Sequence, residues 1–180
     1  MCGLAAIFGP NKLESSNIKD MINSISHRGP DHEGFHYEEN IIMGSCRLSI
    51  FDLSSKGNMP MKDKSGRYLI IYNGEIYNFK ELKNKYEIKT ISNSDTEVLL
   101  ELFAKIGEKT FNEINGIYAF ILYDKTDNKV YCVRDRLGIK PLYYFKKKNN
   151  YFFSSEIKSI LKIFDNININ EKIVKFYLDS

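Results

Sequence analysis

The sequence predicts a domain of the α+β class. Helical segments and strand-like segments share the first two thirds of the chain without a regular strand–helix alternation, which argues against a parallel α/β fold. Four consecutive strand-like segments follow, and the turn residues between them favour hairpins and antiparallel pairing. The 180 residues correspond to one domain. Hydrophobic residues make up 43% of the chain, which is enough apolar surface for a packed core.

The first half of the chain contains three expected strands and two expected helices. In order, these are a strand over 3–8, a helix over 17–26, a loop over 27–34, an extended segment over 41–51, a loop over 56–61, a strand over 67–78 and a helix over 79–86. The helix over 17–26 rests on apolar residues spaced three and four apart. Asn73-Gly74 is a strong turn signal, so we expect the strand over 67–78 to run into a tight turn there.

A well-marked helix opens the second half. Ser94 and Glu97 fit a capping box, with Ser94 as the N-cap, and an apolar face follows over 98–106. A short helix is expected over 107–114. The remaining segments are strands over 117–124, 129–136, 142–147 and 151–156, and helices over 157–164 and 168–180.

Charge and composition exclude several classes of protein. The 26 basic and 23 acidic residues leave a net charge of +3, which is too mild to indicate nucleic-acid binding. No apolar run reaches the ~18 residues of a membrane span, and the N-terminus lacks an export signal, so we expect a cytoplasmic protein. Three cysteines without CxxC spacing argue against a disulfide framework and against a metal site. The sequence also lacks a phosphate-binding loop, so we expect no cofactor for this domain.

Cys2 is the first candidate for chemistry. If Met1 is removed, Cys2 carries both a thiol and a free α-amine, whose pKa near 8 lets it accept a proton near neutral pH. One residue then supplies both nucleophile and base. The alternative is a cysteine that stands second by accident.

Three further features have a functional and a structural interpretation. Asn73 and Gly74 form either a hairpin turn or an oxyanion hole at a strand end. Arg47 is either a surface residue or a planar fork for a carboxylate, and the chain's preference for Lys over Arg favours the second interpretation. Asp95 either favours the dipole of its helix or pairs with a substrate ammonium. Together with Cys2, these features describe a site for an α-amino acid with an attackable acyl group.

The chain resembles a known family, the N-terminal glutaminase domains of glutamine-dependent asparagine synthetases, which are class II amidotransferases. Eight ordered motifs carry the resemblance: MCGLAAIFG (1–9), HRGPD (27–31), RLSIFDLS (47–54), YNGEIYNF (72–79), SDTEVLL (94–100), NGIYAFILYD (115–124), RDRLGIKPLYY (134–144) and SSEIKSIL (154–161). The resemblance implies the N-terminal-nucleophile hydrolase fold, a four-layer αββα sandwich of two antiparallel sheets with outer helices.

The resemblance also implies a role for each matching residue. Cys2 would be the nucleophile and its own amine the base, while Asn73 and Gly74 would form the oxyanion hole. Arg47 would bind the α-carboxylate of L-glutamine, and Glu75 and Asp95 its α-ammonium. The backbone of Leu48, Ser49, Ile50 and Phe51 would line the pocket. No metal is implied, and we assign no chemistry to the motif over 134–144 or to His27.

The resemblance further implies that residues 1–164 form the glutaminase domain and that 165–180 begin the connection to a C-terminal synthetase domain. That domain would bind ATP and Mg²⁺ and make asparagine from aspartate with the released ammonia. A homodimer stays open. Two alternatives also stay open: an amidotransferase acting on another carboxylate, such as a sugar acid, and a catalytically idle domain that binds glutamine or supports a partner.

Overall fold

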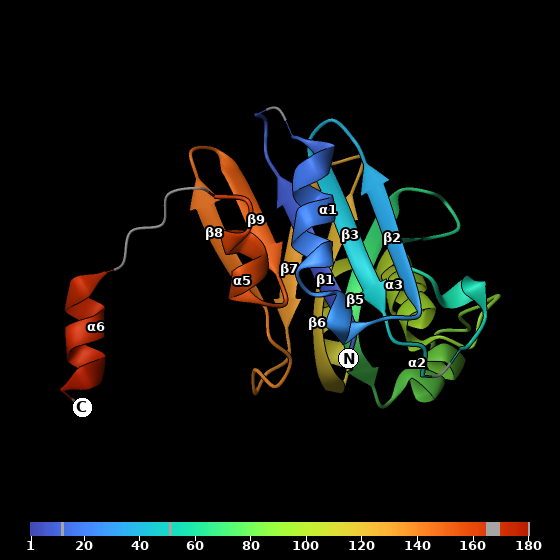
Figure 1. Cartoon of the computed structure of the whole chain (residues 1–180). Helices are drawn as coiled ribbons and strands as arrows, with labels where there is room; N and C mark the ends of the chain where they lie inside the picture. Colours follow the sequence, from blue (N-terminus) through green and yellow to red (C-terminus); the bar gives the residue numbers. More distant parts are fainter. Residues whose placement is uncertain (12, 51, 165–169, 180) are drawn as a thin grey trace.

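The computed structural model describes residues 1–11, 13–50, 52–164 and 170–179. Two antiparallel β-sheets pack face to face, and helices cover their outer faces (Figure 1). This arrangement confirms the expected α+β class and the αββα order of layers.

The first sheet has the strand order β2-β3-β1-β9-β8. Its strands are β1 (Gly3–Phe8), β2 (His32–Tyr37), β3 (Ile41–Arg47), β8 (Tyr143–Lys147) and β9 (Asn150–Ser154). The N-terminal strand β1 lies in the middle, with β3 and β9 as its antiparallel neighbours. Since β1 begins at Gly3, Cys2 is placed at the end of a central, well-buried strand.

The second sheet has the order β4-β5-β6-β7. It consists of β4 (Met61–Lys62), β5 (Tyr68–Ile76), β6 (Gly116–Asp124) and β7 (Lys129–Arg134). The long pair β5 and β6 forms its centre, with Asn73 opposite Ala119 and Gly74 opposite Tyr118.

Helices α1 (Ser15–Asn23) and α5 (Ile157–Leu161) pack on the first sheet. Helix α3 (Asp95–Ile106) packs on β5, with α2 (Phe79–Lys85) and α4 (Thr110–Glu113) beside it. The 3₁₀ turns are η1 (Ser26–Arg28), η2 (Ser55–Gly57) and η3 (Gly107–Lys109). No helix of the described ranges is long and apolar enough to cross a membrane.

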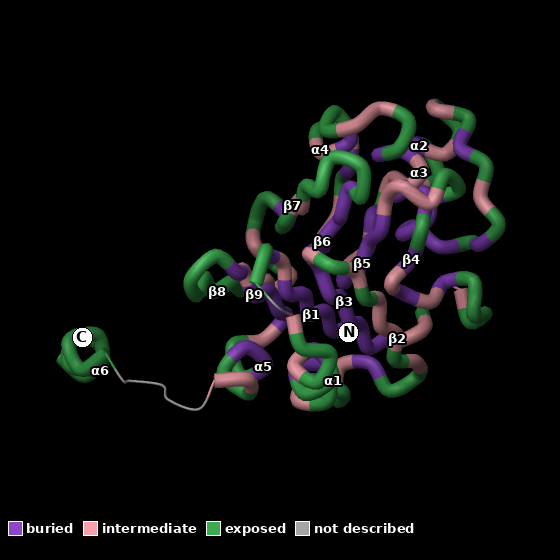
Figure 2. Tube along the Cα trace, turned by 90° about the horizontal axis from the view of Figure 1, so that it is seen from above, coloured by how far each residue is buried: buried purple, intermediate pink, exposed green. Residues whose placement is uncertain are grey.

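Two apolar clusters hold the layers together. The buried residues are concentrated on the central strands β1, β3, β5 and β6 (Figure 2). The larger cluster lies between the sheets and continues under α3, with Phe120 among its fully buried side chains. The smaller cluster lies between the first sheet and α1, where Ile18, Met21 and Ile22 are all buried. The helical periodicity that predicted this helix therefore marked its buried face correctly.

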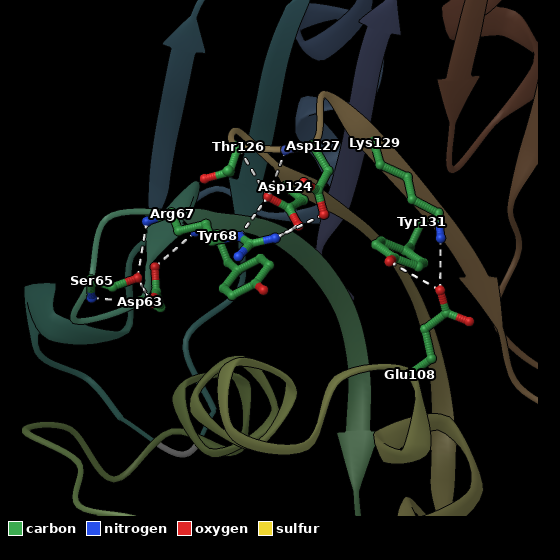
Figure 3. Close-up of polar contacts among 10 residues, drawn as sticks. All are labelled: Asp63, Ser65, Arg67, Tyr68, Glu108, Asp124, Thr126, Asp127, Lys129 and Tyr131. Atoms are coloured by element: carbon green, nitrogen blue, oxygen red, sulfur yellow. Dashed lines mark hydrogen bonds and ion pairs between the residues drawn. The ribbon is translucent and has the colours of Figure 1, made fainter.

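Polar contacts stabilise the second sheet at the end where β5 begins and β6 finishes (Figure 3). The Arg67 guanidinium donates from Nε and Nη2 to both carboxylate oxygens of Asp124, at 2.8 and 2.6 Å. It also contacts Asp127 at 2.9 Å, so one arginine ties the start of β5 to the β6–β7 turn. The ion pair with Arg67 outweighs burial and lowers the pKa of Asp124.

The structure corrects several expected boundaries. The loop expected over 27–34 ends early because β2 begins at His32, and the extended segment over 41–51 ends at Arg47. Ser94 caps α3 as expected, with its Oγ accepting from the N–H of Thr96. Glu97 does not complete the capping box, because its carboxylate accepts from the backbone of Ile91 and Ser92 instead.

The tight turn expected at Asn73-Gly74 is wrong, because β5 runs without interruption to Ile76. A β-carbon on Gly74 would lie 2.3 Å from the carbonyl oxygen of Ile117. Glycine is therefore used here for close approach of two strands and not for a turn.

The structure describes part of the helix expected at the C-terminus. Residues 165–169 and 180 lie outside the described residues. Helix α6 (Glu171–Leu178) falls within the helix expected over 168–180, and all of its residues are exposed. The division of the chain at 164 stays a prediction.

Candidate active site

A cavity of about 100 Å³ opens where the beginning of β1, the end of β3, the C-terminal half of β5 and the beginning of α3 meet. Eight of the ten residues that the sequence assigned to the site line this cavity. Its lining comprises Met1, Cys2, Arg47, Leu48, Ile50, Asp52, Gly57, Met59, Tyr72, Asn73, Gly74, Glu75, Ser94, Asp95, Thr96 and Lys140.

Cys2 is held at the cavity by the backbone around it. Its Sγ lies 3.4 Å from the N–H of Leu48 and 3.6 Å from the carbonyl oxygen of the same residue. Its carbonyl oxygen accepts from Nε of Arg28 at 3.1 Å. The thiol is partly buried, and the nitrogen of Cys2 is joined to Met1, so its use as a base requires removal of Met1.

Asn73 offers an unused hydrogen-bond donor. The residue is 2% exposed, and the described part of the chain gives its Nδ2 no hydrogen-bond partner. A buried amide without a partner costs about 1–3 kcal/mol, so such groups are rare in folded proteins. Because Asn73 lines the cavity with Cys2, this donor is available to an oxygen that develops negative charge beside the thiol.

Arg47 is buried and organises the loop that follows β3. Its Nη1 donates to the carbonyl oxygen of Ser54 at 2.9 Å and to Oδ1 of Asn58 at 2.8 Å, and its Nη2 donates to the carbonyl oxygen of Asp52. Three of its five N–H groups are thus used, which leaves two for a carboxylate. The absence of a side chain at Gly57 makes room for the guanidinium, since a β-carbon there would lie 2.3 Å from Nη2 of Arg47.

The residues after Arg47 are divided between two hollows. Leu48 and Ile50 line the cavity. Ser49 instead lines an adjacent hollow, and its N–H donates to Asp31 at 2.7 Å. Phe51, also assigned to the pocket, lies outside the described residues.

Two carboxylates line the cavity from β5 and α3. Asp95 is 5% exposed, and its Oδ2 accepts from the hydroxyl of Tyr72 at 2.7 Å and from the N–H of Ile76 at 2.9 Å. Burial raises the pKa of Asp95, with the charge of Glu75 acting in the same direction, while the two hydrogen bonds oppose the shift. A cation in the cavity would therefore stabilise the ionised form of Asp95.

Three residues of this region escaped the sequence analysis. Tyr72 positions Asp95, Arg28 joins Cys2 to Glu156, and Lys140 reaches the cavity from the loop after β7. The rarity of Arg in this chain was a usable signal for Arg28. Tyr72 and Lys140 gave none, since apolar strands contain many tyrosines and the chain contains many lysines.

Comparison with known proteins decides the family. The family model for the glutamine amidotransferase domain matches residues 1–180. The chain belongs to this family. It is a glutamine amidotransferase domain, as the eight motifs indicated. Among the described residues, no group of three or more His, Cys, Asp and Glu side chains is arranged to hold a metal ion.

Similar proteins carry the name of glutamine-hydrolysing asparagine synthetases. A putative asparagine synthetase 2 of Methanocaldococcus jannaschii is 40% identical over 98% of this chain and 39% of its own length. Asparagine synthetases 1 and 2 of Bacillus subtilis are 37% and 41% identical, over 99% and 89% of this chain. The chain spans only 29% and 22% of those two proteins.

Solved structures confirm the fold. Glutamine phosphoribosylpyrophosphate amidotransferase of B. subtilis superimposes with a TM-score of 0.74 over 88% of this chain and 43% of its own. A structure titled as the allosteric regulatory enzyme of purine biosynthesis gives 0.76 over 89% of this chain and 43% of its own. Both are 19% identical to this chain, so they support the N-terminal-nucleophile sandwich and not a particular substrate.

Proposed function

We propose that this domain hydrolyses L-glutamine to glutamate and ammonia through a thioester on Cys2, and that the ammonia serves asparagine synthesis. The observation that carries the hydrolysis is the cavity itself. It places a thiol, an unpartnered buried amide donor, an arginine and two carboxylates around one space.

The chemistry begins once Met1 is removed. The α-amine of Cys2 takes the thiol proton, and Sγ attacks the γ-amide carbon of glutamine. The side-chain N–H of Asn73 and the backbone N–H of Gly74 donate to the resulting oxyanion. The α-ammonium then returns the proton to the departing nitrogen, the C–N bond breaks, and ammonia leaves a γ-glutamyl thioester. Water attacks this thioester, releases glutamate and restores the thiol.

Charge complementarity would orient the substrate. The two unused N–H groups of Arg47 match a carboxylate fork. Glu75 and Asp95 would supply negative charge for the α-ammonium, and Leu48 and Ile50 line the same cavity. The backbone of Ser49 and Phe51 stays part of the proposed pocket, as the family resemblance implies.

The proposed use of the ammonia is supported by relatives that are longer than this chain. This chain spans 39%, 29% and 22% of three proteins named as asparagine synthetases, which supports a C-terminal synthetase domain in the same polypeptide. ATP and Mg²⁺ would be bound there, and this chain supplies no step through them. We further propose a cytoplasmic location and leave a homodimer open.

Release of glutamate and ammonia from L-glutamine tests the hydrolysis. The Cys2→Ala variant should lose all activity and retain glutamine binding. The matched Cys132→Ala variant should keep full activity, since Cys132 lies in β7 outside the cavity. Hydrolysis that survives in Cys2→Ala would overturn the mechanism.

A different ammonia acceptor is the second candidate. A relative that is 34% identical over 89% of this chain, from Gibberella zeae, is named an amidase and not an asparagine synthetase. The acceptor is decided with the full-length protein: ATP-dependent conversion of aspartate to asparagine supports our proposal. Glutamine hydrolysis with no asparagine formed would favour another carboxylate. An idle domain would release no glutamate even with Cys2 at the N-terminus.

A further inference from the structure

The loop between β7 and β8 has an unusually well-bonded backbone. The Asp135 carboxylate accepts from four backbone N–H groups at 2.9–3.3 Å, those of Tyr118, Leu137, Ile139 and Lys140. Arg134 closes the loop from its other side, with Nε donating to the carbonyl oxygen of Lys140 at 2.6 Å and Nη2 to that of Gly138. The main chain of Lys140 is therefore fixed through both its N–H and its carbonyl.

This loop delivers the side chain of Lys140 to the active-site cavity. Lys140 lines the same cavity as Cys2, and its Nζ lies 3.3 Å from Sδ of Met1. No carboxylate of the described residues forms an ion pair with Lys140. The lysine is thus anchored at its main chain, and its side chain presents a cation without an acidic partner among the described residues to the Met1 end of the site.

Covalent geometry limits the distance from this cation to the base. Five bonds connect the nitrogen of Cys2 to Sδ of Met1, so Nζ of Lys140 lies within about 10 Å of that nitrogen. Removal of Met1 also takes away the side chain that separates the two groups. The distance is comparable to the screening length at physiological salt, and the cavity is partly shielded from solvent, so the charges interact.

The base needs such a cation because acids share its cavity. Glu75 on β5 and Asp95 on α3 would both stabilise the protonated α-amine and thereby disable it. The other ionisable groups that face Cys2 are its own thiol, Tyr72, Asp52, Arg47 and Arg28, the last of which is paired with Glu156. Of the cations, Arg28 is paired with Glu156, and Arg47, whose partners in the loop over 52–58 are uncharged, is assigned to the α-carboxylate of glutamine. Lys140 is left as the cation with neither an acidic partner among the described residues nor a proposed partner on the substrate.

We propose that Lys140 places a positive charge beside the α-amine of processed Cys2 and so keeps that amine unprotonated, ready to act as the base. The inference rests on the proposed function, since it concerns the base of that reaction. Lys140 acts through Cys2 and needs no contact with glutamine. The motif over 134–144, to which the sequence analysis gave no chemistry, thereby gains a role.

The test compares three variants with the parent chain. Lys140→Met removes the charge with little change in shape, Lys140→Arg keeps it, and Lys19→Met removes the charge of an exposed lysine on α1. Each protein is used with Cys2 at its N-terminus, as verified by mass; if Met1 is retained, the chain is freed from a protease-cleavable leader. Cysteine labelled with ¹³C then reports the titration of Cys2 directly by NMR, without glutamine.

Loss of a unit charge at this range should raise the pKa of the α-amine by about 0.5–1 unit in Lys140→Met. Amine and thiol titrate as a coupled pair, so the whole titration curves are compared. Lys140→Arg and Lys19→Met should match the parent. The acid limb of kcat/KM should move upward by the same amount, which lowers kcat/KM at pH 6 by about 3–10-fold.

The two proposals fail in different ways. An unchanged Cys2 titration in Lys140→Met overturns the role of Lys140, even if the parent chain hydrolyses glutamine. A shifted titration in a chain that does not hydrolyse glutamine supports the electrostatic role and refutes the proposed function. A shift equally large in Lys19→Met would also overturn the inference, because it would show an effect of net charge alone.

Discussion

Replacing Asn73 by alanine separates catalysis from stability. Asn73 is 2% exposed, and its side-chain Nδ2 has no partner within the described structure. Its removal abolishes an unpaired buried donor, which relieves about 1–3 kcal/mol and offsets the packing lost with the side chain. We therefore expect the free energy of unfolding to change by no more than about 1 kcal/mol.

The same change should be costly to the reaction. Loss of one oxyanion-hole donor typically lowers kcat by 10²–10³-fold, which corresponds to about 2.7–4 kcal/mol of transition-state stabilisation. Glutamate release would be followed with a coupled dehydrogenase assay, and stability by urea denaturation. KM should change little, because the donor acts on charge that appears only in the transition state.

Asn78 provides the matched control. Its Nδ2 donates to the carbonyl oxygen of Glu113 and its Oδ1 accepts from the N–H of Asn115, both at 2.9 Å. Asn78→Ala should therefore lower the free energy of unfolding by about 1–3 kcal/mol and leave kcat unchanged. An Asn73→Ala protein with kcat within threefold of the parent, or one destabilised as much as Asn78→Ala, would refute this reasoning.

Two further predictions concern the walls of the site, and a third concerns the loop between β7 and β8 that carries Lys140. Gly57→Ala should raise KM for glutamine at least about tenfold, because its β-carbon would displace the Arg47 guanidinium; an unchanged KM would remove the Gly57–Arg47 contact from substrate binding. Arg47→Lys should weaken glutamine binding by about 1–3 kcal/mol in calorimetry, since a lysine cannot form a bidentate fork, and unaltered affinity would contradict the carboxylate role. Asp135→Asn should destabilise the fold by about 1–3 kcal/mol at pH 7. Burial raises the pKa of Asp135, but its backbone hydrogen bonds outweigh burial and lower it. The stabilisation is therefore present above the unfolded-state pKa near 3.9 and is lost as the pH falls through the folded-state value. Urea denaturation of both proteins from pH 7 to pH 3 should show the difference shrink, and a constant difference would exclude an electrostatic origin.

The sequence was most informative where local pattern and chemistry coincide. The apolar spacing of α1, the N-cap Ser94 and the β1 strand behind Cys2 were all predictable, because each depends on residues close in the chain. Asn73-Gly74 was misjudged as a turn. Its strand continues because Gly74 fits against β6, a partner more than forty residues away in sequence.

The residues of the site could be predicted from the sequence, but the contacts that they make could not. Cys2, Arg47 and Asn73 were identified from residue type and motif, and the fold brings them to one cavity. The use of three Arg47 donors on the following loop could not be predicted, since it depends on the path of the backbone over 52–58. The approach of Lys140 to Met1 joins residues 139 positions apart, which no local pattern records.

The central claim is that Cys2, freed of Met1, is the nucleophile of a glutaminase. It is tested most directly by intact-protein mass after incubation with 6-diazo-5-oxo-L-norleucine, a glutamine analogue that alkylates such nucleophiles. The account predicts loss of Met1 and a single adduct on Cys2, absent from Cys2→Ala and present in Cys132→Ala. A chain with Cys2 at its N-terminus that takes no adduct, or takes it on another residue, would contradict it.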